Sequence, residues 1–377
     1  MNGLSEKATH YLAALLFIGA LAAAWWRAPT PAAPAFVPPP PATASTLPVL
    51  FSAEQLPRAA ASAHAATLAQ LPDGRIAAAW FAGTQEGADD VAIYFSTLGK
   101  DGWSKAQPIA NRESTAGGTF AYVRKVGNPV LYAEGSWLHL WYVSVAVGGW
   151  AGSSINHSVS TDGGATWFKP TKLPTSPFAN ISTLVRTPPI ALADGGLALP
   201  IYHEFIAKHG EWLRLSATGQ ILDKVRMTHP VRTLQPAVVS VDEQRAIAVL
   251  RDAGPGPGKV QVANTTNGGQ SWVAGKALAL PNPNSSVALL RLKSGRLLLA
   301  GNSQNGREAM LLWISADQGK TWQASRTVES APDGGAEFSY PALLLGRDGQ
   351  IHLAYTWRRQ GIKHAAFSEA WLDGAAP

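Results

Sequence analysis

Basic side chains that could bind an anionic ligand are spread along this chain at roughly one arginine per repeating segment. A guanidinium group binds a carboxylate through two parallel hydrogen bonds, so converging arginines would form a site for a small anion. The formal net charge is +6, yet no Lys/Arg-rich run or basic helix accompanies it, which argues against nucleic acid as the partner. The arginines in question are Arg186, Arg251, Arg307, Arg358 and Arg359.

Residues suited to acid–base or nucleophilic chemistry occur at matching places in the same segments. Imidazole, carboxylate and phenol groups are the usual proton carriers and nucleophiles of enzymes. Any one of them could be a solvated loop residue, whereas several at one end of a fold would form a catalytic site. The candidates are His64, Glu86, Asp89, Asp90, His203, Glu204, Glu337 and Tyr340, together with the amides Asn128, Gln235 and Asn284.

The composition excludes several kinds of site. With no cysteine, the chain has no disulfide, thiolate metal ligand or cysteine nucleophile. The histidines show no HExxH motif or paired ligand spacing, so we expect neither a catalytic metal nor a cofactor. The stretch GPGPGK at 254–259 lacks the Ser or Thr that follows the lysine of a phosphate-binding loop, and we interpret it as a turn.

The elements that must position these residues are indicated by a repeated turn. The stretches STDGGATW, TTNGGQSW and SADQGKTW begin at Ser160, Thr265 and Ser315, so the last two are 50 residues apart and the first two 105. Asp or Asn followed by Gly forms a tight turn, and the Trp can pack beneath it. A unit of about 50 residues with several short strands is typical of a propeller blade.

A second repeat runs in phase with these turns. Short apolar runs, a small polar turn and a further strand recur six times between about residues 60 and 372. We therefore predict an all-β, six-bladed β-propeller. The ligand site of such a fold lies over the central channel, where each innermost strand begins and each second strand ends. All the candidate residues fall at these places.

The turns, the six-fold repeat and the end of the chain after a third strand resemble the sialidase (neuraminidase) superfamily, in particular predicted bacterial sialidases with BNR-type (Asp-box) repeats. The resemblance covers about residues 50–372. It implies an exo-glycoside hydrolase that removes terminal acidic sugars from glycans. Arginines would bind the sugar carboxylate, an Asp would act as acid/base, and a Tyr activated by a neighbouring Glu would be the nucleophile.

The resemblance assigns the acid/base role to Asp89, the nucleophile to Tyr340 and carboxylate binding to Arg251 and Arg307. Two positions depart from the family pattern. His64 is nearest to the place of the first arginine, and Gln235 replaces the Glu that assists the tyrosine. Glu204 or Glu337 could supply the missing base. The expected catalytic residues are Asp89, Tyr340, Glu204 and Glu337, and the expected substrate-binding residues are His64, Arg186, Gln235, Arg251, Arg307 and Arg358.

These departures leave two alternatives. One is a uronate-active polysaccharide hydrolase or lyase on the same propeller, in which His64 or His203 would act with Tyr340. The other is a glycan-binding propeller without catalysis, which the loss of the Glu favours. The partner expected in each case is an acidic glycan or polysaccharide.

The N-terminal region predicts export. Residues 1–27 contain an apolar run, 11–26, and we expect a signal or anchor segment; AAA at 22–24 would suit cleavage, whereas Trp25 and Trp26 would suit an interfacial anchor. Residues 28–48 are rich in Pro and Ala and predict a spacer, which leaves 49–377 for the propeller. The expected location is the periplasmic face of the cell membrane, or outside the cell after cleavage. We also expect residues 47–55 to supply the outer strand that completes the last blade.

Overall fold

The computed structural model describes residues 2–27, 34–175, 180–229 and 232–374, which form two separate compact units. The first unit, Met1–Ala33, contains the helix α1 (Asn2–Arg27). Within it, residues 7–24 have a mean hydropathy of 1.4 and are long and apolar enough to cross a membrane. The second unit, Pro34–Pro377, carries all the β-strands.

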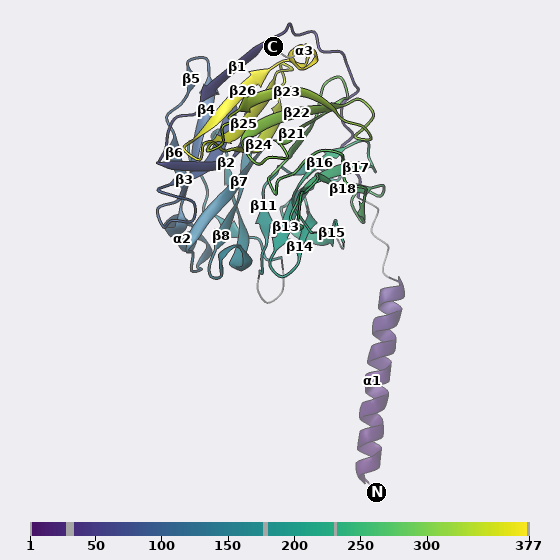
Figure 1. Ribbon diagram of the computed structural model, residues 1–377. Coiled ribbons are helices and arrows are strands. Elements are labelled where there is room, and N and C mark those ends of the chain that lie inside the picture. Colours follow the sequence, from purple (N-terminus) through teal and green to yellow (C-terminus); the bar gives the residue numbers. More distant parts are fainter. Residues whose placement is uncertain (1, 28–33, 176–179, 230–231, 375–377) are drawn as a thin grey trace. The chain divides into compact units, whose positions relative to one another are not determined.

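The second unit is a six-bladed β-propeller, as the sequence predicts (Figure 1). Each blade is an antiparallel sheet of four or five strands. The first blade contains β2 (Ser62–Gln70), β3 (Ile76–Gly83), β4 (Ala92–Gly99), β5 (Gly102–Trp103) and β6 (Gln107–Ala110). The second contains β7 (Lys125–Glu134), β8 (Trp137–Val145), β9 (Ser153–Ser160) and β10 (Thr171–Lys172). The third contains β11 (Leu184–Val185), β12 (Ile190–Ala191), β13 (Leu197–Glu204), β14 (Lys208–Leu215) and β15 (Ile221–Arg226).

The remaining blades have four strands each. The fourth contains β16 (Thr233–Ser240), β17 (Ala246–Asp252), β18 (Gln261–Thr265) and β19 (Val273–Ala274). The fifth contains β20 (Ala288–Arg291), β21 (Leu297–Asn302), β22 (Ala309–Ser315) and β23 (Gln323–Ser330). The sixth contains β24 (Phe338–Leu345), β25 (Ile351–Trp357), β26 (Gly361–Phe367) and β1 (Phe51–Gln55). Short helical segments lie at α2 (Arg112–Thr119), η1 (Gly149–Gly152) and α3 (Glu369–Asp373).

The strands near the channel are continuously apolar because neighbouring blades cover both of their faces. All eight residues of β3 are buried. Alternating burial along a whole strand appears farther out, in β15, where every second residue is exposed. The core therefore forms a ring of interfaces between blades. Because these interfaces are apolar, the polar residues of the inner strands lie at the strand ends.

The repeated Asp/Asn–Gly turns join third and fourth strands and serve the architecture. In the turn after β9, the hydroxyl and backbone N–H of Thr166 donate to Asp162 at 2.5 and 2.9 Å, and these bonds lower the pKa of the Asp162 carboxyl to about 2. Trp167 donates to the carbonyl of Gly164 and packs against Phe95. Because an inner strand begins at the end of the blade opposite to the end of its third strand, these turns lie away from the predicted site.

The sixth blade is closed by the N-terminal strand, and this prediction is confirmed. β1 pairs antiparallel with β26 from Phe51↔Phe367 to Gln55↔Lys363. Figure 1 shows the two strands side by side, one from each end of the propeller sequence. The pairing covers the edge that β26 would otherwise expose.

The segment that precedes β1 was expected to be a spacer over residues 28–48, but part of it packs on the propeller. Residues 28–33 lie outside the described residues, but from Pro34 onward the chain belongs to the propeller unit. Phe36 is completely buried and packs edge-on against Trp212 at 6.1 Å. Farther along, Thr43 donates its N–H to the carbonyl of Lys293. The buried ring of Phe36 and this backbone hydrogen bond dock the Pro/Ala-rich stretch on the blades.

We predict that β1 is needed for a stable sixth blade. Two truncated chains, one beginning at residue 49 and one at residue 57, differ only in this strand and its flanks. The shorter chain should lose at least roughly 5 °C in thermal midpoint, because it exposes the backbone groups of β26 and a face that Phe51 covers. Scanning calorimetry of both chains measures this difference. Equal midpoints would contradict the closure role.

Candidate functional site

A repeated bulge at the start of the inner strands builds the site. In β2, β7, β16 and β24 two residues stand opposite one residue of the second strand. One residue of each bulge has a left-handed backbone, and Asn284 takes the same conformation just before β20. A bulge redirects a side chain out of the regular alternation, here toward the channel mouth. The left-handed residues are Ala65 (φ 56°), Asn128 (45°), Gln235 (52°), Asn284 (52°) and Tyr340 (53°).

The Tyr340 hydroxyl is the centre of a hydrogen-bond network. Arg251 donates Nη1–H to this oxygen at 2.9 Å, and Gln235 donates its amide N–H at 3.4 Å. The same Gln235 amide donates at 3.4 Å to the hydroxyl of Tyr202, which also accepts from Asn128 at 3.0 Å. Three bulges and the end of β13, which contributes Tyr202, therefore meet here. The sequence analysis did not single out Tyr202.

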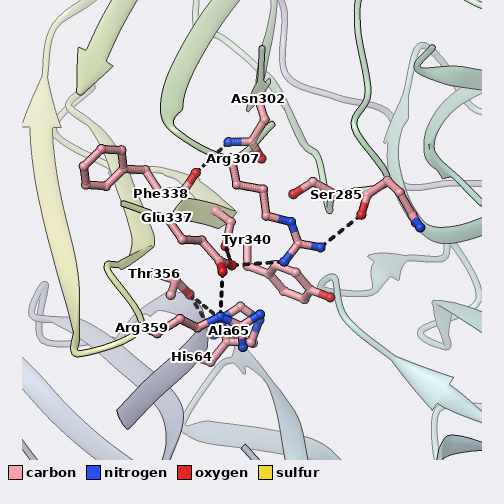
Figure 2. Close-up of polar contacts among 12 residues, drawn as sticks. His64, Ala65, Ser285, Asn302, Arg307, Glu337, Phe338, Tyr340, Thr356 and Arg359 are labelled. Carbon is pink, nitrogen blue, oxygen red and sulfur yellow. Dashed lines mark hydrogen bonds and ion pairs between the residues drawn. The ribbon is translucent and has the colours of Figure 1, made fainter. Parts of the chain in front are cut away.

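A second cluster surrounds Glu337. Arg307 Nη1 donates to one carboxylate oxygen at 3.0 Å and Arg359 Nε to the other at 2.8 Å, as Figure 2 shows. The Ser339 hydroxyl adds a third bond at 2.5 Å. Burial would raise the pKa of Glu337, but these hydrogen bonds and the two positive charges outweigh it, so the pKa is lowered. Glu337 is thus ionised at neutral pH and forms ion pairs with two arginines.

The two predicted carboxylate-binding arginines lie in one place. Arg251 Nε donates to the Asn284 side-chain oxygen at 2.7 Å, and Arg307 Nη2 donates to the Asn284 carbonyl at 3.0 Å. Arg307 also lies over the Tyr340 ring, 5.5 Å from its centroid. Within the described part of the chain, Arg251 forms no ion pair with a carboxylate. Its charge is available to a ligand.

His64 lies against the Tyr340 ring, with 4.1 Å between ring centroids. Its Nδ1 shares a 2.8 Å hydrogen bond with the Thr356 hydroxyl. Burial, followed by the charges of four arginines, lowers the pKa of His64 well below its usual value of 6.5. Those arginines are Arg359, Arg186, Arg307 and Arg251. His64 is therefore neutral at neutral pH.

Two of the arginines expected to bind substrate have other partners in the structure. Arg186 is 2 % exposed, and its guanidinium donates to the backbone carbonyls of Ala66, Tyr340 and Pro341 at 2.8–3.2 Å. Burial lowers its pKa to about 10, so it remains charged. Arg358 is exposed and stacks over Trp357. The last blade instead places Arg359 in the site, where it also pairs with Glu86 at 2.5 Å.

The structure does not bring the expected carboxylates to the Tyr340 hydroxyl. Asp89 is 72 % exposed in its side chain and pairs with Arg112 at 3.2 Å. Glu204 pairs with Lys208 at 3.4 Å. Among the described residues, the hydroxyl of Tyr340 is bonded only to Arg251 and Gln235.

The remaining candidates from the sequence have other partners. Asp90 accepts from the backbone and hydroxyl of Thr84 within its own loop, and His203 stacks on His209 at 4.9 Å. Among the described residues no group of three or more His, Asp or Glu could hold a metal ion.

A cavity of about 410 Å³ is a separate feature of the channel. Its walls come from all six blades and consist mostly of the apolar residues that follow the bulges. Arg186 also lines it, so this buried arginine separates the apolar channel from the polar cluster at Tyr340. The chemistry-bearing residues lie at the mouth.

The fold and this mouth define a six-bladed propeller with a cationic polar site on its axis. The profile of the BNR repeat-like domain matches residues 74–353, and the chain belongs to this family. No curated protein matches the chain.

Solved structures with the same fold include several sialidases. A Hadza microbial sialidase has a TM-score of 0.66 and 16 % identity over 82 % of this chain and 66 % of its own. The Trypanosoma rangeli sialidase has a TM-score of 0.66 and 16 % identity over 84 % of this chain and 56 % of its own. A protein of unknown function from Dyadobacter fermentans has a TM-score of 0.66 and 16 % identity over 84 % of this chain and 97 % of its own. At such identities the likeness establishes the fold alone.

We predict that Arg186 stabilises the fold and that Arg358 does not. Arg186→Met should lower the free energy of unfolding by about 3 kcal/mol, because it leaves the carbonyls of two bulges without their donor. Arg358→Gln, the matched loss of an exposed arginine, should change it by less than about 0.5 kcal/mol. Urea unfolding of the three proteins measures the difference. Equal stability of both variants would contradict the positioning role of Arg186.

Proposed function

We propose that this protein is a glycoside hydrolase that acts on a terminal acidic sugar, as a sialidase-like exo-enzyme. The observation that carries the proposal is the meeting of Arg251 and Arg307 on Asn284, beside the Tyr340 hydroxyl. Arginines arranged around one polar group fit a carboxylate bidentately. The similarity to sialidase structures supports the same class of ligand.

In the proposed reaction the sugar carboxylate binds Arg251 and Arg307, and the anomeric carbon faces Tyr340. The phenol oxygen forms a bond to that carbon, its proton passes to a base, and the glycosidic bond breaks. The leaving oxygen takes a proton from an acid, for which Asp89 is our candidate. Water then hydrolyses the glycosyl–tyrosine bond and returns the phenol.

Our candidate for the base is His64. Its imidazole is neutral at neutral pH and lies against the Tyr340 ring. Glu337 is ionised, but two arginines and Ser339 occupy its oxygens. Glu204, which pairs with Lys208, would have to move to serve. A uronate-active hydrolase or lyase would use the same arginines together with His64.

A second candidate function is glycan binding without turnover. It is favoured by the partners of the Tyr340 hydroxyl, since neither Arg251 nor the amide of Gln235 accepts a proton at neutral pH. For either function we propose export, with α1 as a signal or membrane anchor, because it is long and apolar enough to span a bilayer. The propeller would then act on extracytoplasmic glycans.

Loss of Arg251 or Arg307 should weaken acidic-sugar binding. Arg251→Gln and Arg307→Gln should each raise the Kd for N-acetylneuraminic acid or glucuronic acid by about 10- to 100-fold, because each removes a charge-assisted contact. Isothermal titration calorimetry gives the constants, and Arg358→Gln is the control for loss of one positive charge. Undiminished affinity in both variants would refute acidic-sugar recognition at this mouth.

The Tyr340→Phe variant decides between hydrolase and binder. It removes one oxygen and keeps the ring that packs on His64 and Arg307. Under the hydrolase proposal, turnover of fluorogenic sialosides or uronosides should fall by about 100-fold or more while ligand affinity persists. Tyr202→Phe, which removes a buried hydroxyl of the same network, should keep turnover within an order of magnitude.

Two results would count against the covalent mechanism. Unchanged turnover in Tyr340→Phe would exclude tyrosine as the nucleophile. Acidic-sugar binding without any turnover by the unmodified protein would favour the glycan-binding alternative.

A further inference from the structure

A second basic cavity, of about 230 Å³, opens at the same end of the propeller as the candidate site. It lies among the hairpin that joins β13 to β14, the end of β15 and the residues just before β16. Because β13 ends and β16 begins at the channel mouth, the cavity belongs to the face that carries Gln235 and Tyr202. Its lining residues are Ile206, Ala207, Lys208, His209, Arg226, Thr228, His229 and Arg232.

The cavity carries an excess of positive charge. Arg226 and Arg232 are exposed, and neither forms an ion pair in the part of the chain that the structure describes. Lys208 pairs with Glu204 at 3.4 Å. The other nearby carboxylate, Glu211, lies close to His209 and to a lysine outside the lining. Two guanidinium groups are thus left for a ligand.

A buried histidine gives this cavity a fixed polar wall. His209 is 5 % exposed and stacks on His203. Its Nε2 lies 3.2 Å from the Glu211 carboxylate, whereas its Nδ1 is buried and has no partner among the described residues. A buried nitrogen without a partner is costly. In the tautomer that carries its proton on Nδ1, this nitrogen has a hydrogen bond to give to an acceptor in the cavity.

The cavity is close enough to the first site for one ligand to reach both. Arg232 stands three residues before Gln235, which is about 10 Å along an extended strand. Across the blade, Tyr202 contributes to the first site, while its neighbour His203 stacks on the His209 of the cavity. The two groups of cations therefore lie on neighbouring parts of the mouth of the propeller.

We propose that this cavity is a second anion subsite, which binds the carboxylate of a further acidic sugar in the same glycan chain. The proposal rests on the proposed function, because it assumes that the terminal acidic sugar occupies Arg251 and Arg307. It specifies the substrate as a polyanionic glycan that carries acidic residues beyond the terminal one. A monoanionic glycan would leave Arg226 and Arg232 without a ligand.

The first test compares monomers with oligomers. Titration calorimetry with N-acetylneuraminic acid and its α2,8-linked tetramer, and with galacturonic acid and tetragalacturonate, gives the oligomer-to-monomer affinity ratio. For at least one pair the unmodified protein should prefer the oligomer by about tenfold or more, since the second contact is intramolecular. Arg226→Gln/Arg232→Gln should reduce this ratio to about one and leave the monomer affinity unchanged.

The control variant Lys100→Gln/Lys105→Gln removes the same net charge from an exposed turn outside the cavity and should keep the preference. An equal preference in the Arg226/Arg232 variant, or no oligomer preference in the unmodified protein, overturns the polyanion proposal.

The second test does not depend on the proposed function. Inorganic sulfate is titrated while the imidazole nitrogens of His209 are followed by NMR, with the signals assigned by their absence in His209→Gln. Sulfate should shift these signals in the unmodified protein and in Arg251→Gln/Arg307→Gln, but not in Arg226→Gln/Arg232→Gln. This result supports the subsite even if no acidic monosaccharide binds, in which case the proposed function alone fails. Absence of a shift in the unmodified protein overturns the subsite itself.

Discussion

The buried guanidinium of Arg186 is the interaction on which the geometry of the site depends. A bulge removes carbonyls from the regular ladder, and such groups are costly when buried unless a donor replaces the lost one. Arg186, which comes from the third blade, supplies donors to Ala66 in the first blade and to Tyr340 and Pro341 in the last. It thereby holds the bulges of the two blades that meet where the propeller closes, and sets the direction of the Tyr340 side chain.

The charge around Tyr340 is unbalanced, and this explains several features together. Arg251, Arg307 and Arg359 surround the ring and the Glu337 carboxylate, and Arg186 lies beneath. Burial, followed by these positive charges, lowers the pKa of His64 and keeps it neutral, whereas the hydrogen bonds of Arg359 and Ser339 and the charges of Arg359 and Arg307 lower the pKa of Glu337 and keep it ionised. A neutral sugar would bring no carboxylate to compensate Arg251, whereas an acidic one would.

The sequence predicted the architecture more completely than the site. Turn residues and apolar runs are local signals, so the blades and the closing strand β1 could be inferred from spacing alone. The sequence analysis did not predict the bulges, although Asn128, Gln235 and Tyr340 each precede a proline, which is a local signal for three of them. Burial was not visible, however. Arg186 and Arg358 are alike in the sequence, and only the packed structure separates a positioning residue beneath the ring from an exposed one. Phe36 shows the same limit, since one apolar residue in a Pro-rich stretch gives no periodic signal.

Gln235 decides the hydrogen bonding at the Tyr340 oxygen, because an amide and a carboxylate at this position would form different hydrogen bonds with Tyr340 and Arg251. With Gln235, both Arg251 and the amide direct N–H groups at the Tyr340 oxygen, so that oxygen accepts two hydrogen bonds. Its own O–H has no acceptor among the described residues, so it can donate to a ligand oxygen. A carboxylate at this position would instead accept the phenol proton and pair with Arg251. The amide therefore leaves the charge of Arg251 free for a ligand while it removes the nearest proton acceptor. The substitution thus separates two properties that a glutamate would couple, the positive charge at the mouth and the means of accepting the phenol proton.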